Sequence, residues 1–300
     1  MTARRARPVT PGRAAGPGPV VYWMRREHRV HDNWALLHAQ SLALEASRSL
    51  VVAWCLARGY LGATRRQFGF LLRGLAEVAR ELQELRIPFV LLEGEPGAEI
   101  ARFASNAHSL VTDFDPLRPK RQWLAEAAAA LPCPVVEVDG RNVCPAWLVS
   151  DKREYMARTI RPKIHRLLPE FLEPFPEPVP HPHVYEIPVQ SPDFMAALDR
   201  LGADAAVSEV SWATPGPAAG LAMLDDFLAN RLPRYEQRSD PNAGAVSLLS
   251  PWLHFGMLSA QRAALCASRA TAPTGSKDAF LEELIVRREL ADNFCLHTAD

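Results

Sequence analysis

Residues 20–140 alternate between short apolar runs and longer helical patterns, and this alternation constrains the fold more than any other feature of the chain. The run VVYWM at residues 20–24 is typical of a buried strand. Further strands are expected at residues 50–56, 88–92, 110–112 and 135–138, separated by helices at 33–47, 65–85, 95–105 and 120–130. This order favours a doubly wound parallel sheet, which binds ligands beyond the carboxyl ends of its strands.

The pattern changes after residue 150. Residues 151–172 are expected to be helical, and residues 173–192 carry seven prolines, which indicates an extended connector. From Gly216 onward the periodic segments, at residues 221–230, 259–269 and 277–297, are all helical. The sequence therefore predicts an α/β domain at residues 20–150, an interdomain helix with a proline-rich linker at 151–215, and the first part of an all-α domain at 216–300.

The N-terminal residues 1–19 contain four arginines and no acidic residue, without the apolar stretch of a secretory signal. We expect a disordered basic leader, with a targeting peptide or a nucleic-acid-contacting arm as the alternatives. The formal net charge of the whole chain is zero, which argues mildly against a nucleic-acid-binding protein but does not exclude a local basic patch.

The spacing of the cysteines and histidines indicates whether the chain can bind a metal ion and in which cellular compartment it works. Five cysteines lie without CxxC spacing and nine histidines without a metal-binding pattern, so we expect no metal site. A reducing cytoplasm is the simplest setting for such cysteines. No apolar run approaches the roughly 20 residues of a membrane-spanning helix, so no membrane association is expected.

The segment SLLSPWLHFG, which begins at Ser247, places hydroxyl groups directly before an expected helix start. Ser247 and Ser250 can donate hydroxyl hydrogen bonds, and the free N–H groups of a helix start favour anions. Together they could cradle a diphosphate. Serine and proline are also ordinary residues at a helix start, so the spacing alone leaves both interpretations open.

The expected helix at residues 277–297 carries Phe280, Glu283 and Arg287 on one face. The simplest expectation is a solvated ion pair between Glu283 and Arg287, which are four residues apart. The functional alternative is that this face lines a cavity, with Arg287 toward a phosphate and Glu283 toward a substrate carbonyl.

Several longer motifs follow one another in order: VVYWMRREHRVHDNWALLHAQ, VTDFDPLRPKRQW, RTIRPKIHRLLPEFL, RYEQRSDP, SLLSPWLHFGMLSAQR and FLEELIVRRELADNFC. From residue 20 onward the chain thereby resembles the class II cyclobutane pyrimidine dimer DNA photolyases. The most specific of these motifs are VTDFDPLR, LSPWLHFG and EELIVRREL. The resemblance implies a Rossmann-like antenna domain followed by part of an all-α FAD-binding domain.

The resemblance also implies functional residues. Matches to the family's positions around the flavin phosphates, ribityl chain and ring are Tyr235, Ser247, Leu248, Leu249, Ser250, Phe280 and Arg287. Glu283 matches the carboxylate that contacts the pyrimidine dimer, and Arg238 matches a position near the DNA. The chain departs from the family at Ser239, where asparagine is usual, and the spacing from Tyr235 to Arg238 is one residue short.

The implied activity is light-dependent DNA repair. An antenna pigment, a deazaflavin in many relatives, passes excitation to FAD, and excited reduced FAD gives one electron to a pyrimidine dimer in UV-damaged DNA. The ring then splits and the electron returns. Glu283 is expected to be catalytic by hydrogen-bonding a thymine carbonyl of the extruded dimer.

The family's flavin domain normally continues well beyond Asn293, so the resemblance also suggests a chain truncated at its C-terminus. The missing half could be supplied by a separate chain. Alternatively, the chain is a non-catalytic relative that binds a chromophore or nucleotide as a light sensor or binding module. We expect a monomer, or a protein that depends on the missing C-terminal segment.

Overall fold

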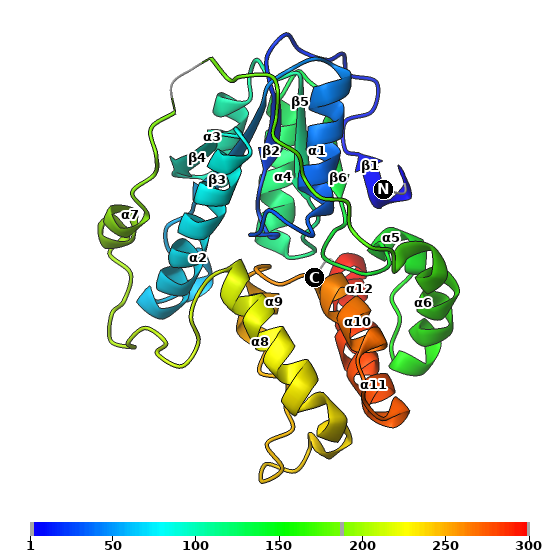
Figure 1. Ribbon diagram of the computed structural model, residues 1–300. Coiled ribbons are helices and arrows are strands. Elements are labelled where there is room, and N and C mark those ends of the chain that lie inside the picture. The colour runs from blue at the N-terminus through cyan, green and yellow to red at the C-terminus, as the bar shows by residue number, and fades with distance from the viewer. Residues whose placement is uncertain (1–2, 187–188, 299–300) are drawn as a thin grey trace.

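The structure, a computed structural model, describes residues 3–186 and 189–298 (Figure 1). A sheet with helices on both of its faces forms one half of the molecule, and helices alone form the other half (Figure 1). The strands are β1 (Ala6–Pro8), β2 (Val20–Trp23), β3 (Leu50–Leu56), β4 (Phe89–Glu93), β5 (Ser109–Asp113) and β6 (Val135–Val138).

The six strands lie in the order β1-β6-β5-β2-β3-β4. β2 to β6 pair in parallel, as the sequence predicts, and β1 pairs antiparallel with β6. The chain builds outward from β2 through β3 to β4, then returns to the other side of β2 for β5 and β6. The carboxyl end of β2 is therefore the switch point at which such sheets bind ligands.

Alternate residues of the central strands face opposite layers of helices, as the two-residue period of a strand requires. Val20 and Tyr22 of β2 belong to the apolar core under α1 (Trp34–Glu45) and α2 (Arg65–Glu84). Val21 and Trp23 belong to the core under α3 (Pro96–Phe103) and α4 (Arg118–Ala130). Burial on both faces explains why these strands are continuous apolar runs in the sequence.

The helical half begins with α5 (Ala146–Val149) and α6 (Ala157–Phe171), so α6 starts six residues later than predicted. Its remaining helices are α8 (Pro217–Asn230), α9 (Ser250–His254), α10 (Ala260–Arg269), α11 (Thr274–Leu281) and α12 (Arg288–His297). The core of this half also takes in Val143, Cys144 and Val149, so its packing begins before residue 150. The linker contains one helix that the sequence did not reveal, α7 (Phe194–Leu201), which packs on α2.

The expectation of a disordered leader is wrong for residues 3–8, and residues 1–2 lie outside the described part of the chain. After a 3₁₀ turn, β1 pairs with β6, with Ala6 opposite Val138. Arg5, completely buried, donates hydrogen bonds to the carbonyl of Val143 (3.0 Å), the carbonyl of Phe171 (2.6 Å) and Oε1 of Gln261 (3.0 Å). The N-terminal segment therefore ties the sheet to the helical half.

Candidate functional site

Arg238 and Glu283 form an ion pair in the helical half, with Nη2 of Arg238 3.1 Å from Oε1 of Glu283. The guanidinium of Arg238 also lies over the ring of Tyr235, 5.3 Å from its centroid. Both charged side chains are partly exposed. The structure thus brings the predicted DNA-side arginine into contact with the predicted catalytic carboxylate, although 45 residues separate them.

The helix that carries Glu283 is not a regular α-helix. Residues Glu282–Arg287 form a π-helical segment between α11 and α12, a feature frequent at functional sites. The wider turn disfavours the expected pair between Glu283 and Arg287, and that expectation is wrong. Arg287 instead lies 3.7 Å from the carboxylate of Glu282, which accepts two hydrogen bonds from Arg161 of α6. Those bonds lower the pKa of Glu282.

A buried aromatic cluster supports this pair from behind. The ring of Phe280 lies 5.3 Å from that of Tyr235 and 4.7 Å from that of Phe227. Phe280 is 3% exposed and Tyr235 is 7% exposed, so both rings form the wall of the site and offer little surface to a ligand. Burial also raises the pKa of Tyr235.

The loop before α9 has an unusual backbone at Leu248, whose φ is +60°. A positive φ in a residue with a Cβ is unfavourable, and such strain clusters at ligand-binding sites. The turn exposes the Leu248 side chain and buries Leu249 completely. Ser250, the first residue of α9, is exposed, and Oγ of Ser247 accepts a hydrogen bond from N–H of Leu249 at 3.5 Å.

A second site lies at the carboxyl ends of β2 and β3. The sequence predicts ligand binding at this edge of the sheet without indicating the residues involved. A cavity of about 280 Å³ opens between the sheet and α9. It adjoins a smaller cavity of about 70 Å³ against Trp23 and Trp54. Residues that line both cavities are His28, Tyr60, Phe68, Leu71 and Lys120.

Burial shifts the pKa values of titratable groups around these cavities, and hydrogen bonds fix the position of some of their side chains. Burial lowers the pKa of His28 to about 3, and Nε2 of this neutral ring accepts a hydrogen bond from Nε1 of Trp54 at 3.1 Å. Burial lowers the pKa of Lys120 to about 8. Two buried polar atoms, Oη of Tyr60 and Nε of Arg26, have no hydrogen-bond partner among the described residues. They can serve a ligand, because buried polar groups rarely stay unpaired.

The chain belongs to the DNA photolyase family, because the sequence profile of DNA photolyase matches residues 20–181. The deoxyribodipyrimidine photo-lyase of Potorous tridactylus is 49% identical over 284 residues, covering 92% of this chain and 53% of that protein. The enzyme of the same name from Arabidopsis thaliana is 44% identical over 295 residues, covering 93% of this chain and 59% of that protein. The chain thus spans little more than half the length of these relatives.

Solved structures share the fold. A bacterial class III photolyase from Agrobacterium tumefaciens superposes with a TM-score of 0.71 at 22% identity, over 96% of this chain and 61% of its own. An archaeal photolyase from Sulfolobus tokodaii, described with two FAD molecules, superposes with a TM-score of 0.68 at 15% identity. The match covers 93% of this chain and 60% of that protein. At these identities the likeness supports the mixed α/β fold.

Within the described ranges 3–186 and 189–298, no cluster of three or more histidine, cysteine or acidic side chains is arranged to hold a metal ion. None of the helices described there has both the length and the apolarity needed to cross a membrane.

Proposed function

We propose that this chain takes part in the light-dependent repair of cyclobutane pyrimidine dimers, with FAD as its cofactor and UV-damaged DNA as its substrate. The observation that carries the proposal is the contact between Arg238 and Glu283 above the aromatic wall of Tyr235 and Phe280. An acceptor and a donor at one exposed point, next to an apolar wall, suit a base taken out of the DNA stack. The class II assignment rests on the sequence motifs and is part of the proposal.

The residues around the loop before α9 fit FAD. Ser247 and Ser250 offer hydroxyl groups beside the start of α9, and among the described residues the exposed guanidinium of Arg287 has one ionic contact, at 3.7 Å with Glu282. The two hydroxyl groups could donate hydrogen bonds to a diphosphate, and the family resemblance assigns Arg287 to the same cofactor. Leu249 is buried and can contribute only its backbone. FAD bound here would supply the electron for dimer splitting.

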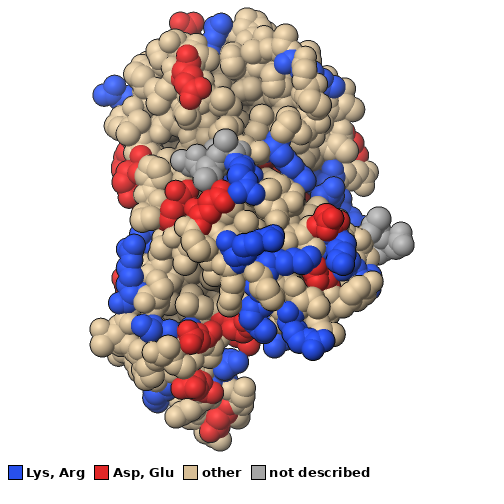
Figure 2. Space-filling view, turned by 90° about the vertical axis from the view of Figure 1, so that its right-hand side faces the viewer, with Lys and Arg blue, Asp and Glu red and all other residues tan. Residues whose placement is uncertain are grey.

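Glu283 would accept or share a hydrogen bond with a pyrimidine of the dimer, and Arg238 would hold its carboxylate in position. Arg238 also places a cation beside the DNA backbone. A wider basic surface accompanies the site: Figure 2 shows Lys and Arg gathered on the face that carries α6. That helix contains Arg158, Arg161, Lys163 and Arg166, so a chain of zero net charge still presents a local surface for phosphates.

The cavity at the carboxyl ends of β2 and β3 is our candidate site for the antenna pigment, for which we propose a deazaflavin. Tyr60 and Phe68 line both this cavity and the smaller one that adjoins it, and Trp54 lines the smaller one. The unpartnered Tyr60 Oη and Arg26 Nε can hydrogen-bond a polar ring edge. The five cysteines are free, which suits the reducing cytoplasm that we propose for the chain.

The test compares Glu283→Gln with Glu282→Gln in a light-dependent dimer-repair assay, in which loss of dimers is followed with and without blue light. We expect Glu283→Gln to lower the repair rate roughly tenfold, because the residue would touch the reacting base. Glu282→Gln should stay near wild type, since that carboxylate is bonded to Arg161. Equal rates for the two variants would contradict the role of Glu283, and FAD binding without any repair would favour a non-catalytic binding module.

A further inference from the structure

Lys120 is one of only four lysines in the chain, beside thirty arginines. It lies in the first turn of α4 and lines both cavities at the carboxyl ends of β2 and β3. Its side chain is 12% exposed. The side chain therefore borders the cavities, while bulk water reaches little of it.

Neighbouring groups fix the position and the charge of the Lys120 amine. Nζ donates a hydrogen bond to the carbonyl of Arg25 and lies 3.5 Å from the carboxylate of Asp115. Burial lowers the pKa of Lys120 to about 8, and the charges of Arg26 and Arg25 act in the same direction against that of Asp115. At pH 7 roughly one tenth of the molecules then have a neutral amine. A neutral amine can still donate its hydrogen bond to Arg25, and its lone pair makes it a nucleophile.

Tyr60 supplies a hydroxyl group to the same space. The centroid of its ring lies 5.7 Å from Nζ of Lys120, and Tyr60 also lines both cavities. Oη of Tyr60 is buried and has no hydrogen-bond partner among the described residues. Burial raises the pKa of Tyr60 to about 12, so the hydroxyl keeps its proton and can donate a hydrogen bond to a ligand. Neighbouring side chains thus offer a nucleophile and a hydrogen-bond donor.

The larger cavity has the size and the surface for a small aromatic molecule. Its volume is about 280 Å³, near the lower limit of small-molecule sites. Phe68, Leu71 and Phe255 line it together with Tyr60. A flat ring would cover these apolar side chains, and a carbonyl group on that ring could then meet the amine of Lys120.

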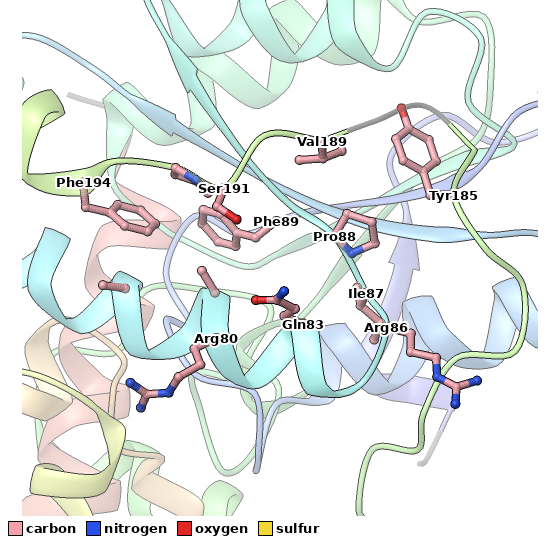
Figure 3. Close-up of a pocket in the computed structure, with 13 residues that line it drawn as sticks. Arg80, Gln83, Arg86, Ile87, Pro88, Phe89, Tyr185, Val189, Ser191 and Phe194 are labelled. Atoms are coloured by element: carbon pink, nitrogen blue, oxygen red, sulfur yellow. The ribbon is translucent and has the colours of Figure 1, made fainter.

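A groove of about 450 Å³ on the same sheet lacks this chemistry (Figure 3). It lies on α2 beside Phe89, the first residue of β4, and therefore at the amino end of that strand. Figure 3 shows Arg80 and Arg86 pointing away from the groove. None of the described residues that line it is a lysine, a cysteine or a histidine. This groove is therefore suited to a control substitution.

We propose that Lys120 forms a Schiff base with an aromatic aldehyde that binds in the cavity at the carboxyl ends of β2 and β3. The amine nitrogen adds to the aldehyde carbon while the hydroxyl of Tyr60 donates a hydrogen bond to the carbonyl oxygen. A C–N bond forms and the C–O double bond breaks. Both amine hydrogens leave with the oxygen as water, and a C=N bond remains, so the step needs no oxidant or reductant. The inference does not rest on FAD or on DNA repair, and the aldehyde would exclude the pigment proposed for the same cavity.

The first experiment incubates the full chain with salicylaldehyde at neutral pH, traps imines with sodium cyanoborohydride and measures the labelling of each lysine by peptide mass spectrometry. We expect Lys120 to be labelled about tenfold faster than the exposed Lys152, because the cavity holds the aldehyde beside the amine. Salicyl alcohol, which has the same ring without the aldehyde, should slow the labelling of Lys120 and leave that of Lys152 unchanged. Equal labelling of the two lysines, or no labelling of Lys120, would overturn the proposal.

Substitutions in the cavity separate a built site from general reactivity. Tyr60→Phe keeps the ring and removes the hydroxyl, so the labelling rate of Lys120 should fall at least about tenfold. Ala63→Leu fills part of the cavity and should also slow labelling, whereas Ala79→Leu, in the groove of Figure 3, should leave the wild-type rate. Thermal unfolding of each variant checks that it is folded. Wild-type labelling of Lys120 in folded Tyr60→Phe or Ala63→Leu would contradict the reaction geometry that we propose.

Discussion

Arg5→Ala should lower the free energy of unfolding by about 3–5 kcal/mol. The guanidinium of Arg5 lies between the rings of Trp34 and Phe171, 5.1 Å and 4.9 Å from their centroids. Its removal would leave the carbonyls of Val143 and Phe171 buried without this donor, while the amide oxygen of Gln261 would keep only the hydrogen bond from Nε1 of Trp34. Chemical denaturation of the purified variant measures the loss.

The neighbouring residue gives the matched control. Arg4 forms an ion pair with Glu170, but its side chain is 53% exposed. Arg4→Ala should therefore change the stability by at most about 1 kcal/mol. Similar small effects for both substitutions would contradict the assignment of Arg5 as the contact that joins the sheet to the helical half.

Stability should fall by about 2 kcal/mol between pH 6.5 and 8 because of Glu289. Glu289 is 4% exposed, and burial raises its pKa to about 8. Oε1 accepts N–H hydrogen bonds from Val143 (2.7 Å) and Cys144 (3.1 Å), while Oε2 has no hydrogen-bond partner among the described residues. A raised carboxyl pKa means that the folded state holds the proton longer than the unfolded state. The stabilisation by protonated Glu289 is complete below the pKa of the unfolded state and is lost as the pH rises through 8.

Other groups change the stability less than Glu289 in this window: the buried Lys120, whose pKa is lowered to about 8, adds only a small rise in stability near pH 8 that partly offsets the decline. Burial lowers the pKa of His28 to about 3 and that of His254 to about 4, so their contributions change only below their ordinary pKa near 6.5. Urea denaturation at each pH should show the decline in the wild type and almost none in Glu289→Gln. Glu84→Gln, at an exposed position, should behave like the wild type. If the free energy of unfolding of the wild type did not change across this pH range, Glu289 would be ionised in the folded state, which would contradict the prediction.

The parallel strands could be predicted because both of their faces are buried. Val20, Val21, Tyr22 and Trp23 are each at most 1% exposed, and such burial selects an unbroken apolar run. The resemblance placed Arg238 and Glu283 at one site, and the structure joins them. No periodicity in the sequence predicts that contact, because it depends on how the 3₁₀ segment Leu232–Gln237, which precedes Arg238, packs against α11.

The remaining features arise from long-range packing. β1 pairs with a strand some 130 residues away, and the short segment ARP has no strand pattern of its own. The π-helical turn at Glu282 keeps the helical apolar pattern and changes only which side chains meet, so sequence spacing predicted the wrong partner for Glu283. The cavity near Tyr60 is lined by loop residues and by residues of α2, α4 and α9, which come together only in the folded chain.

The most direct test of the central claim is the visible absorption spectrum of the purified chain before and after addition of FAD and removal of the unbound excess. We predict flavin bands that stay with the protein, and a weaker retained signal when Ser250 and Arg287 are replaced together by alanine. A protein that stays colourless after incubation with FAD would contradict the assignment of the loop before α9 and the π-helical face as a flavin site.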